Sequence, residues 1–286
     1  MGDVTTSQVA PAVSPLLAQP VIAASAEHGA KRLTAQRVAT VVVTAVGYLV
    51  LWQVLCSFLK LREDVLPRPT QVASALQHNW RVLSSDLWIT AKEVLGGLAL
   101  SVGVGVPLGI VIALSRKIER AVYPLLIASQ SVPVVAIAPL FLIWFGFGFQ
   151  SKLYIAALIG FFPIVVNTFV GLNSVDQELL LMAKANGGSE YRNFMKVRWM
   201  AALPMILTGA KLAGSLAVIG AVVAEFVAGN AGLGYEIVTA QGSLNTSLAF
   251  AAIALLVVSS LVLWNLLATL ERVLVPWHQS QRRGHA

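Results

Sequence analysis

Six long apolar runs constrain the fold of this chain more than any other feature. They are Val38–Leu59, Leu87–Ser115, Ala121–Phe147, Leu153–Leu172, Met205–Ala228 and Leu248–Leu270. A helix needs about 20 mostly apolar residues to cross the hydrocarbon layer of a membrane. Because 57% of the 286 residues are hydrophobic and only 12% are charged, an ordinary soluble domain is excluded. The sequence therefore predicts an all-α integral membrane protein with six transmembrane helices.

The basic residues are unevenly distributed between these runs. If the N-terminus lies in the cytoplasm, thirteen of the 20 Lys and Arg residues lie in cytoplasmic segments, five in outer segments and two within runs. The excess of positive charge on cytoplasmic segments predicts that both termini are cytoplasmic. The formal net charge of +7 then reflects membrane topology, and we expect the lipid bilayer rather than nucleic acid as a partner.

The chain is expected to divide into four parts. Residues 1–33 form a flexible cytoplasmic tail, because they are rich in Ala, Ser and Pro and lack the basic start of a signal peptide. Residues 34–86 hold the first transmembrane helix and an external amphipathic helix over Thr70–Leu83. Residues 87–271 form the transmembrane core, and residues 272–286 form a cytoplasmic tail.

The third apolar run contains Pro124, Pro133 and Pro139, each of which removes a backbone donor. A broken helix is tolerated in a membrane where it is buried in protein or lines a cavity. This run is therefore a candidate wall of a translocation pathway. Polar residues in the runs could line that pathway or simply bond neighbouring helices. The candidates are Gln130, Ser131, Pro133, Asn167, Thr168 and Glu225.

Four charged residues in the runs are interpreted as follows. Glu225 could face the pathway or lie at the outer membrane interface. Lys211 is expected to extend to the inner surface. Lys92 and Glu93 are expected to form a local pair at the outer interface.

The charged segment Leu179–Pro204 separates two of the runs and predicts two short helices, Leu179–Asn186 and Glu190–Met200. Gly187-Gly188 provides the turn between them, since Gly tolerates positive φ. Ser189 stands at the N-cap position of the second helix. Pro204 is expected to end that helix, where the next apolar run begins.

Several catalytic and metal-binding motifs are absent from the sequence. There is no P-loop GxxxxGK[ST], no GxSxG elbow and no HExxH, so neither ATP binding in the usual way nor hydrolysis is indicated. The one cysteine, Cys56, allows no intrachain disulfide, and the four histidines lack the spacing of metal ligands. We therefore expect neither an enzyme nor a metal site.

Within the charged segment, Ala183, Gly187 and Leu203-Pro204 resemble the EAA loop of permease subunits of bacterial ABC importers. Leu181 and Met182 stand where that family has Glu and Ala, which places the expected contact on Gly187 and the second helix. Similarity to the nitrate, sulfonate and taurine branch extends in order from Leu66 to Glu271. It includes LPRPTQV, VPLGIVIALS, SVPVVAIAPLFLIWFGFG and TGAKLAGSLAVIGAVVAEFVAGNAGLGYEI.

The resemblance implies a type I importer core of the MetI-like fold that works as a homodimer in the bacterial inner membrane. It also implies two separate ATPase subunits, which bind ATP and Mg, and an extracytoplasmic substrate-binding protein, with no cofactor on this chain. The substrate would be a small anion such as nitrate, taurine or bicarbonate, or a small heterocycle of pyrimidine or flavin type. The implied ATPase-coupling residues are Ala183, Lys184, Gly187, Gly188, Ser189, Tyr191, Arg192, Phe194, Met195 and Lys196.

Two other functions fit the residues alone. A stand-alone secondary transporter or channel could use the proline-broken third run as its pathway and would need no ATPase. A membrane scaffold could recruit a partner through the charged segment without transporting a solute.

Overall fold

The computed structural model describes residues 39–40, 42–60, 62–185 and 189–277. The chain divides into two compact units, residues 1–60 and residues 61–286. In the first unit, the apolar run forms the helix Val42–Phe58. The second unit contains the remaining helices, whose bounds follow in chain order. They are α2 Pro69–His78, α3 Trp80–Leu114, α4 Arg116–Ser129, α5 Val134–Phe145, α6 Phe149–Asn173, α7 Gln177–Ala185, α8 Glu190–Asn193, the π-helix η1 Phe194–Arg198, α9 Trp199–Ala228, α10 Leu233–Gly242 and α11 Thr246–Leu274.

In the described part of the chain, four helical stretches are long and apolar enough to cross a membrane. They are α3, α6, α11 and the continuous stretch Glu190–Val227 formed by α8, η1 and α9. The pair α4 and α5 makes a fifth stretch that is bent by 98°. With the shorter helix Val42–Phe58, each of the six predicted runs contains a described helix, which is consistent with six spans.

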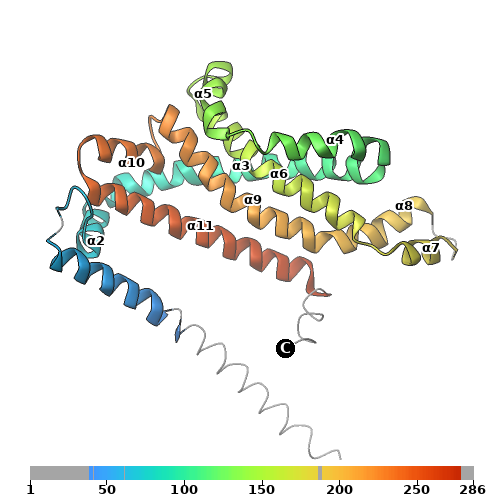
Figure 1. Cartoon of the computed structure of the whole chain (residues 1–286), viewed down its shortest axis with the longest axis horizontal. Helices are drawn as coiled ribbons and strands as arrows, with labels where there is room; N and C mark the ends of the chain where they lie inside the picture. The colour runs from blue at the N-terminus through green and yellow to red at the C-terminus, as the bar shows by residue number, and fades with distance from the viewer. Residues whose placement is uncertain (1–38, 41, 61, 186–188, 278–286) are drawn as a thin grey trace, which may run out of the picture. The chain divides into compact units, whose positions relative to one another are not determined.

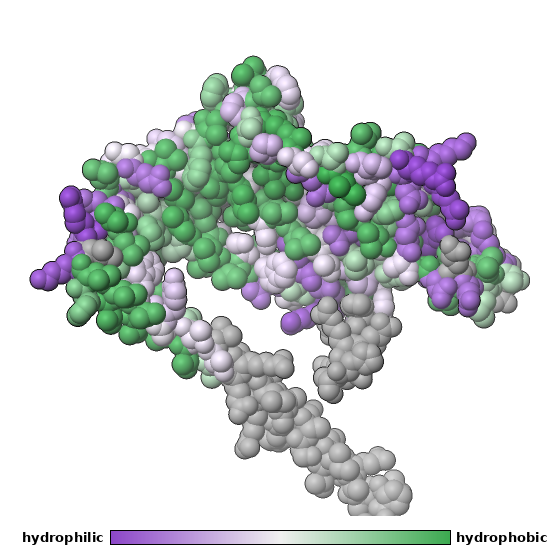
Figure 2. All heavy atoms as spheres, in the orientation of Figure 1, coloured by the Kyte–Doolittle hydropathy of each residue, from purple (hydrophilic) through white to green (hydrophobic). Residues whose placement is uncertain are grey.

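The long helices of the second unit lie roughly side by side, with α10 near one end and α7 and α8 near the other (Figure 1). Hydrophobic side chains cover the middle of this unit in the view of Figure 2, and hydrophilic side chains gather near its two ends. This banding is the pattern expected for a bundle whose middle faces lipid. We call these two ends of the second unit the α10 end and the α7–α8 end.

The core is formed where α6 packs between α3 and α9. A Cβ added at Gly97 of α3 would lie 2.7 Å from Cβ of Ala156, and one added at Gly220 of α9 would lie 2.7 Å from Cα of the same alanine. Ala156 is fully buried. Because no side chain separates the backbones at these positions, the three helices approach closely, as small residues allow in membrane proteins.

The expectation that Pro204 ends a helix is wrong. Pro204 lies inside α9, and the helical stretch runs through this residue from Glu190 to Val227. A proline removes one backbone donor, but a helix in a packed bundle can tolerate that loss. Here Pro204 is buried and the neighbouring Ala202 is fully buried, so packing against the bundle holds the helix at this point. The charged segment is therefore joined to α9 without a break.

Two other boundaries differ from the sequence expectation. The amphipathic run breaks at Asn79, whose side chain donates to the Ala75 carbonyl at 2.9 Å, and α3 begins at Trp80. The third run was expected to be a broken helix. In the structure it forms two helices, α4 and α5, that meet at a bend of 98°. The break lies between Ser129 and Val134, with Pro133 at the N-cap of α5.

Candidate functional site

The α7–α8 end contains the helices expected to couple the chain to an ATPase. Ser189 caps α8, since its hydroxyl accepts a hydrogen bond from the Arg192 amide at 3.3 Å. The Lys184 ammonium of α7 pairs with the Glu190 carboxylate of α8 at 2.6 Å. The predicted N-cap is thus present, and an exposed ion pair links the two short helices.

The three apolar coupling candidates of the second helix face different surroundings. Tyr191 is 72% exposed and Met195 is 42% exposed. Phe194 instead packs against a buried cluster that includes Leu172 and Ala202. Of these three side chains, Tyr191 and Met195 therefore contribute exposed apolar surface, while Phe194 anchors the helix to the bundle.

The remaining coupling candidates lie around the same two helices. Arg192 and Lys196 are exposed, and Ala183 is half-buried on α7. A hollow of about 500 Å³ between α7 and α8 is lined by Lys184 and Tyr191, among others. Gly187 and Gly188 lie outside the described residues.

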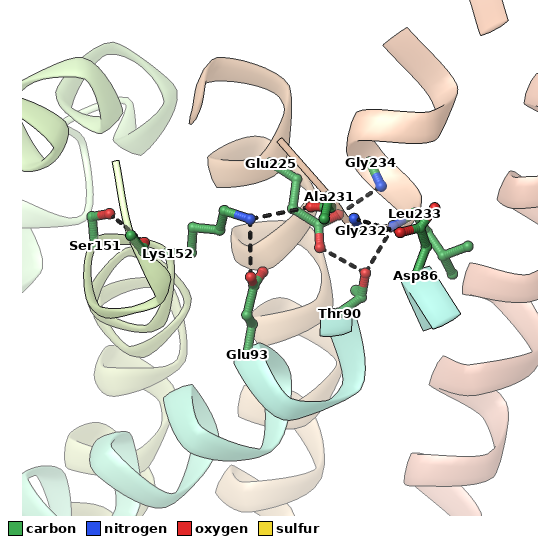
Figure 3. A network of polar contacts seen from close by, with 11 residues as sticks. Asp86, Thr90, Glu93, Ser151, Lys152, Glu225, Ala231, Gly232, Leu233 and Gly234 are labelled. Atoms are coloured by element: carbon green, nitrogen blue, oxygen red, sulfur yellow. Dashed lines mark hydrogen bonds and ion pairs between the residues drawn. The ribbon is translucent and has the colours of Figure 1, made fainter. Parts of the chain in front are cut away.

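A buried ion pair lies toward the α10 end of the bundle. The Lys152 ammonium of α6 contacts the Glu93 carboxylate of α3 at 3.1 Å, and the two side chains are only 4% and 1% exposed. Lys152 also donates to the Ala231 carbonyl at 3.2 Å (Figure 3). The expected pair of Lys92 with Glu93 is therefore wrong, because adjacent helical residues point in different directions. Lys92 instead lies over the Trp88 ring.

Glu225 of α9 belongs to the same region and is 1% exposed. The Thr90 hydroxyl donates to Glu225 Oε1 at 2.6 Å, and the Gly234 amide donates to Oε2 at 2.6 Å. The Leu233 amide donates in turn to the Thr90 hydroxyl at 2.9 Å. Glu225 thus holds the start of α10 against α3 and α9, as Figure 3 shows. We call these residues, with Glu93, Lys152 and Asp86, the polar network.

The polar network requires an unusual backbone at the start of α10. Gly232 has φ +112°, and a Cβ there would lie 2.0 Å from Glu225 Oε1, so only glycine fits. Asp86 accepts a hydrogen bond from the Gly232 amide at 3.0 Å. Burial raises the pKa of Glu236 on α10, and the nearby charge of Asp86 raises this pKa further.

The six pathway candidates lie in separate places. Gln130, Ser131 and Pro133 are exposed and lie in the connection between α4 and α5. Asn167 and Thr168 lie on α6, where the Asn167 amide donates to the Pro163 carbonyl at 2.8 Å. Thr168 is fully buried, like Glu225. The exposed polar surface among the candidates therefore belongs to the α4–α5 connection.

Lys211 does not extend to the surface as the sequence suggested. Its ammonium pairs with the Glu271 carboxylate of α11 at 2.6 Å, and the two side chains are 13% and 17% exposed. The Lys211 ammonium also lies 5.7 Å from the centre of the Trp264 ring. An acidic partner on another helix satisfies the charge, and this contact ties α9 to α11.

Sequence reasoning missed most of the polar network. Asp86, Thr90 and Glu93 have the spacing i, i+4, i+7, which places them on one face of a helix. That spacing could have indicated a buried polar face on α3. The partners on α6 and α9 carry no local signal of this kind.

Several known proteins are similar in sequence to this chain. The family described as binding-protein-dependent transport system inner membrane component matches residues 105–276. The riboflavin transport system permease protein RibX of Chloroflexus aurantiacus is 41% identical over 243 residues, which cover 83% of this chain and 90% of the relative.

Two further relatives are named for other substrates. The formylaminopyrimidine transport permease ThiX of Halalkalibacterium halodurans is 34% identical over 82% of this chain and 93% of its own length. The taurine transport system permease TauC of Escherichia coli is 30% identical over 80% of this chain and 86% of its own length.

A solved structure shares the fold. The inward-facing methionine ABC transporter MetNI contains a chain that superimposes with a TM-score of 0.59 at 18% identity, covering 68% of this chain and 97% of that one. The chain belongs to the binding-protein-dependent transport system inner membrane component family, and it is the non-catalytic, multi-pass permease subunit of an ABC importer of the inner membrane.

Proposed function

We propose that this permease works as a homodimer with both termini in the cytoplasm and is driven by two ATPase subunits. The ATPases bind ATP and Mg and dock on α7 and α8. A substrate-binding protein delivers the solute at the α10 end, which is then the outer end. ATP binding opens the dimer outward, and hydrolysis returns it to the inward-facing state.

One observation carries the coupling proposal: α8 continues without a break through η1 into the membrane span. The stretch Glu190–Val227 is helical throughout, with Pro204 inside it. A displacement of α8 by an ATPase is therefore passed directly to α9. Tyr191 and Met195 supply exposed apolar surface for the contact, and Arg192 and Lys196 supply positive charge beside it.

The pathway is proposed to pass the α4–α5 connection at the interface between two copies. Gln130, Ser131 and Pro133 are exposed there, which supports a role in contact with solute or with the second copy. Asn167 is half-buried on α6 and lies further from solvent. Thr168 and Glu225 are buried inside one chain, so we assign them to packing within the subunit.

The substrate is proposed to be a small planar heterocycle of flavin or pyrimidine type. Two of the relatives are named for riboflavin and formylaminopyrimidine transport. Aromatic rings cluster where α5 meets α6, with Phe141 5.7 Å from Trp144 and from Phe145, and Phe145 4.7 Å from Tyr154. Trp144 is 63% exposed, so a ring face is accessible for stacking.

The coupling proposal is tested by replacing Tyr191 with alanine in the chain co-expressed with its ATPase. We expect Tyr191→Ala to reduce co-purification of the ATPase and ATP-driven uptake while leaving membrane insertion unchanged. Val273→Ala is the matched control, because Val273 is 71% exposed on α11. Gly187→Val is expected to abolish coupling as well. Normal ATPase binding and uptake by both the Tyr191 and Gly187 variants would disprove the coupling role.

The substrate proposal is tested by uptake into proteoliposomes that contain the complete transporter. Labelled riboflavin and formylaminopyrimidine are compared with labelled taurine, with and without ATP. ATP-dependent uptake of taurine alone would contradict the heterocycle proposal and leave the coupling proposal intact. Uptake driven by an ion gradient in this chain alone would instead indicate a secondary transporter.

A further inference from the structure

A second hollow at the α7–α8 end has no role in the coupling proposal. It measures about 750 Å³ and lies between the end of α3, α4, the end of α6 and η1. Three arginines line it, Arg116 and Arg120 from α4 and Arg198 from η1. These residues come from distant parts of the sequence, so the fold brings their charges together.

The residues that line this hollow carry more positive than negative charge. Glu119 is the carboxylate among its lining residues, which leaves three positive charges against one negative charge. Within the described ranges, none of the three arginines forms an ion pair. The nearby Glu190 is already paired with Lys184 at 2.6 Å. Lys184 lowers the pKa of the Glu190 carboxyl, and the charge of Arg198 helps to lower it to a smaller extent. Guanidinium groups that form no ion pair still favour an external anion, and their planar donors suit phosphate.

The hollow also has an apolar wall. Phe169 and Val170 of α6 and Leu114 of α3 line it next to the arginines. Leu114 is 59% exposed and Val170 is 38% exposed, so this wall opens outward. Figure 2 shows hydrophilic side chains at this end of the bundle beside the hydrophobic band. The hollow is thus charged on one side and apolar on the other.

We propose that this hollow binds the phosphate of an anionic phospholipid, with an acyl chain along Leu114 and Val170. Basic pockets between membrane helices on the cytoplasmic side suit such headgroups. A free anion offers the same phosphate chemistry but leaves the apolar wall uncovered, and this favours the lipid. The assignment to the cytoplasmic leaflet rests on the proposed orientation, whereas the binding itself does not.

Lipid binding is measured on the full chain in detergent, by native mass spectrometry during titration with phosphatidylglycerol or phosphatidylcholine. We expect phosphatidylglycerol to bind more tightly. At roughly 1 kcal/mol per basic residue near a membrane surface, each change Arg116→Gln, Arg120→Gln or Arg198→Gln should weaken its binding about fivefold. Glu119→Gln should strengthen binding, a direction that damage to the fold would not produce.

Lys117→Gln is the matched control, since Lys117 is exposed on α4 but does not line the hollow. Its binding of phosphatidylglycerol should stay within about twofold of wild type, well inside the fivefold expected for each arginine. Inorganic phosphate is titrated in parallel to separate a free-anion site from a lipid site. Equal binding of the two lipids, displacement of the lipid by millimolar phosphate, or equal losses in the control and the arginine variants would each overturn the proposal. Because no ATPase is present, these results are independent of the coupling experiment.

Discussion

The charged residues at the two ends of the helical bundle differ in their burial and in their pairing. At the α10 end, Glu93, Lys152 and Glu225 are almost fully buried, and their partners come from the same chain. At the α7–α8 end, Tyr191 is exposed and Arg198 has no ion pair within the described ranges. The charged groups of the α10 end therefore have partners within the chain. The α7–α8 end instead exposes groups that could bind a second molecule. Substitutions at the first end should alter stability, and substitutions at the second should alter function.

The largest effect is expected from Lys152→Met. This change leaves the Glu93 carboxylate buried without its counter-ion, which costs about 3–5 kcal/mol of unfolding free energy. Denaturant unfolding in detergent measures the loss. The double variant Lys152→Met with Glu93→Met should recover most of it, because a buried pair can be replaced by apolar side chains. If Lys152→Met alone were as stable as wild type, the pair of Lys152 with Glu93 would not be what stabilises the α10 end.

A smaller loss is expected from Thr90→Val. The change removes a hydroxyl that donates to Glu225 and accepts from the Leu233 amide. Leaving these buried groups unsatisfied costs about 1–3 kcal/mol. Thr239→Val on the exposed face of α10 is the control and should be nearly neutral. Equal stability of the two variants in thermal unfolding would argue against the role assigned to Thr90.

The next effect depends on pH and concerns Glu236. Because burial and Asp86 raise its pKa in the folded chain, the folded state holds this proton more tightly than the unfolded state. Stability should therefore fall as pH rises from the ordinary carboxyl range through the raised pKa. Glu236→Gln should flatten this part of the profile and be more stable than wild type above it. An unchanged slope of melting temperature against pH would contradict the prediction.

No measurable change in stability is expected from Lys184→Gln. The pair with Glu190 is exposed, with side-chain exposures of 52% and 82%, and water screens such pairs. The variant instead tests function, since Lys184 lies in the coupling segment. A loss of stability as large as that of Thr90→Val would remove the contrast between the two ends.

Local sequence signals predicted much of the fold. The six runs follow from hydropathy, and the N-cap at Ser189 follows from the preference of serine for that position. Family resemblance supplied the coupling role of this segment. Pro133 indicated a break, but the 98° angle depends on how α4 and α5 pack on other helices. Local rules can place a break along the chain without giving its direction.

The polar network and the separate pair of Lys211 with Glu271 were less predictable, because these contacts connect segments that are distant in the sequence. Glu93 and Lys152 lie 59 positions apart, and Lys211 and Glu271 lie 60 positions apart. A single sequence shows neighbours on one helix but not partners on another. The nearest opposite charge in sequence, Lys92, was therefore a misleading choice for Glu93. Pro204 misled in a similar way, since tertiary packing outweighed its local tendency to end a helix.

The close approach of α3, α6 and α9 at Gly97, Ala156 and Gly220 also limits how this permease can move. A Cβ added at Gly97 or at Gly220 would lie 2.7 Å from an atom of Ala156, so a lengthwise slide of α6 that placed a larger side chain opposite these backbones would produce a clash. We therefore expect little shear between these helices and propose that the three move as one rigid body. On this proposal the hinges of a transport cycle lie elsewhere, and the connection between α4 and α5, which is bent by 98°, is the position we propose for one.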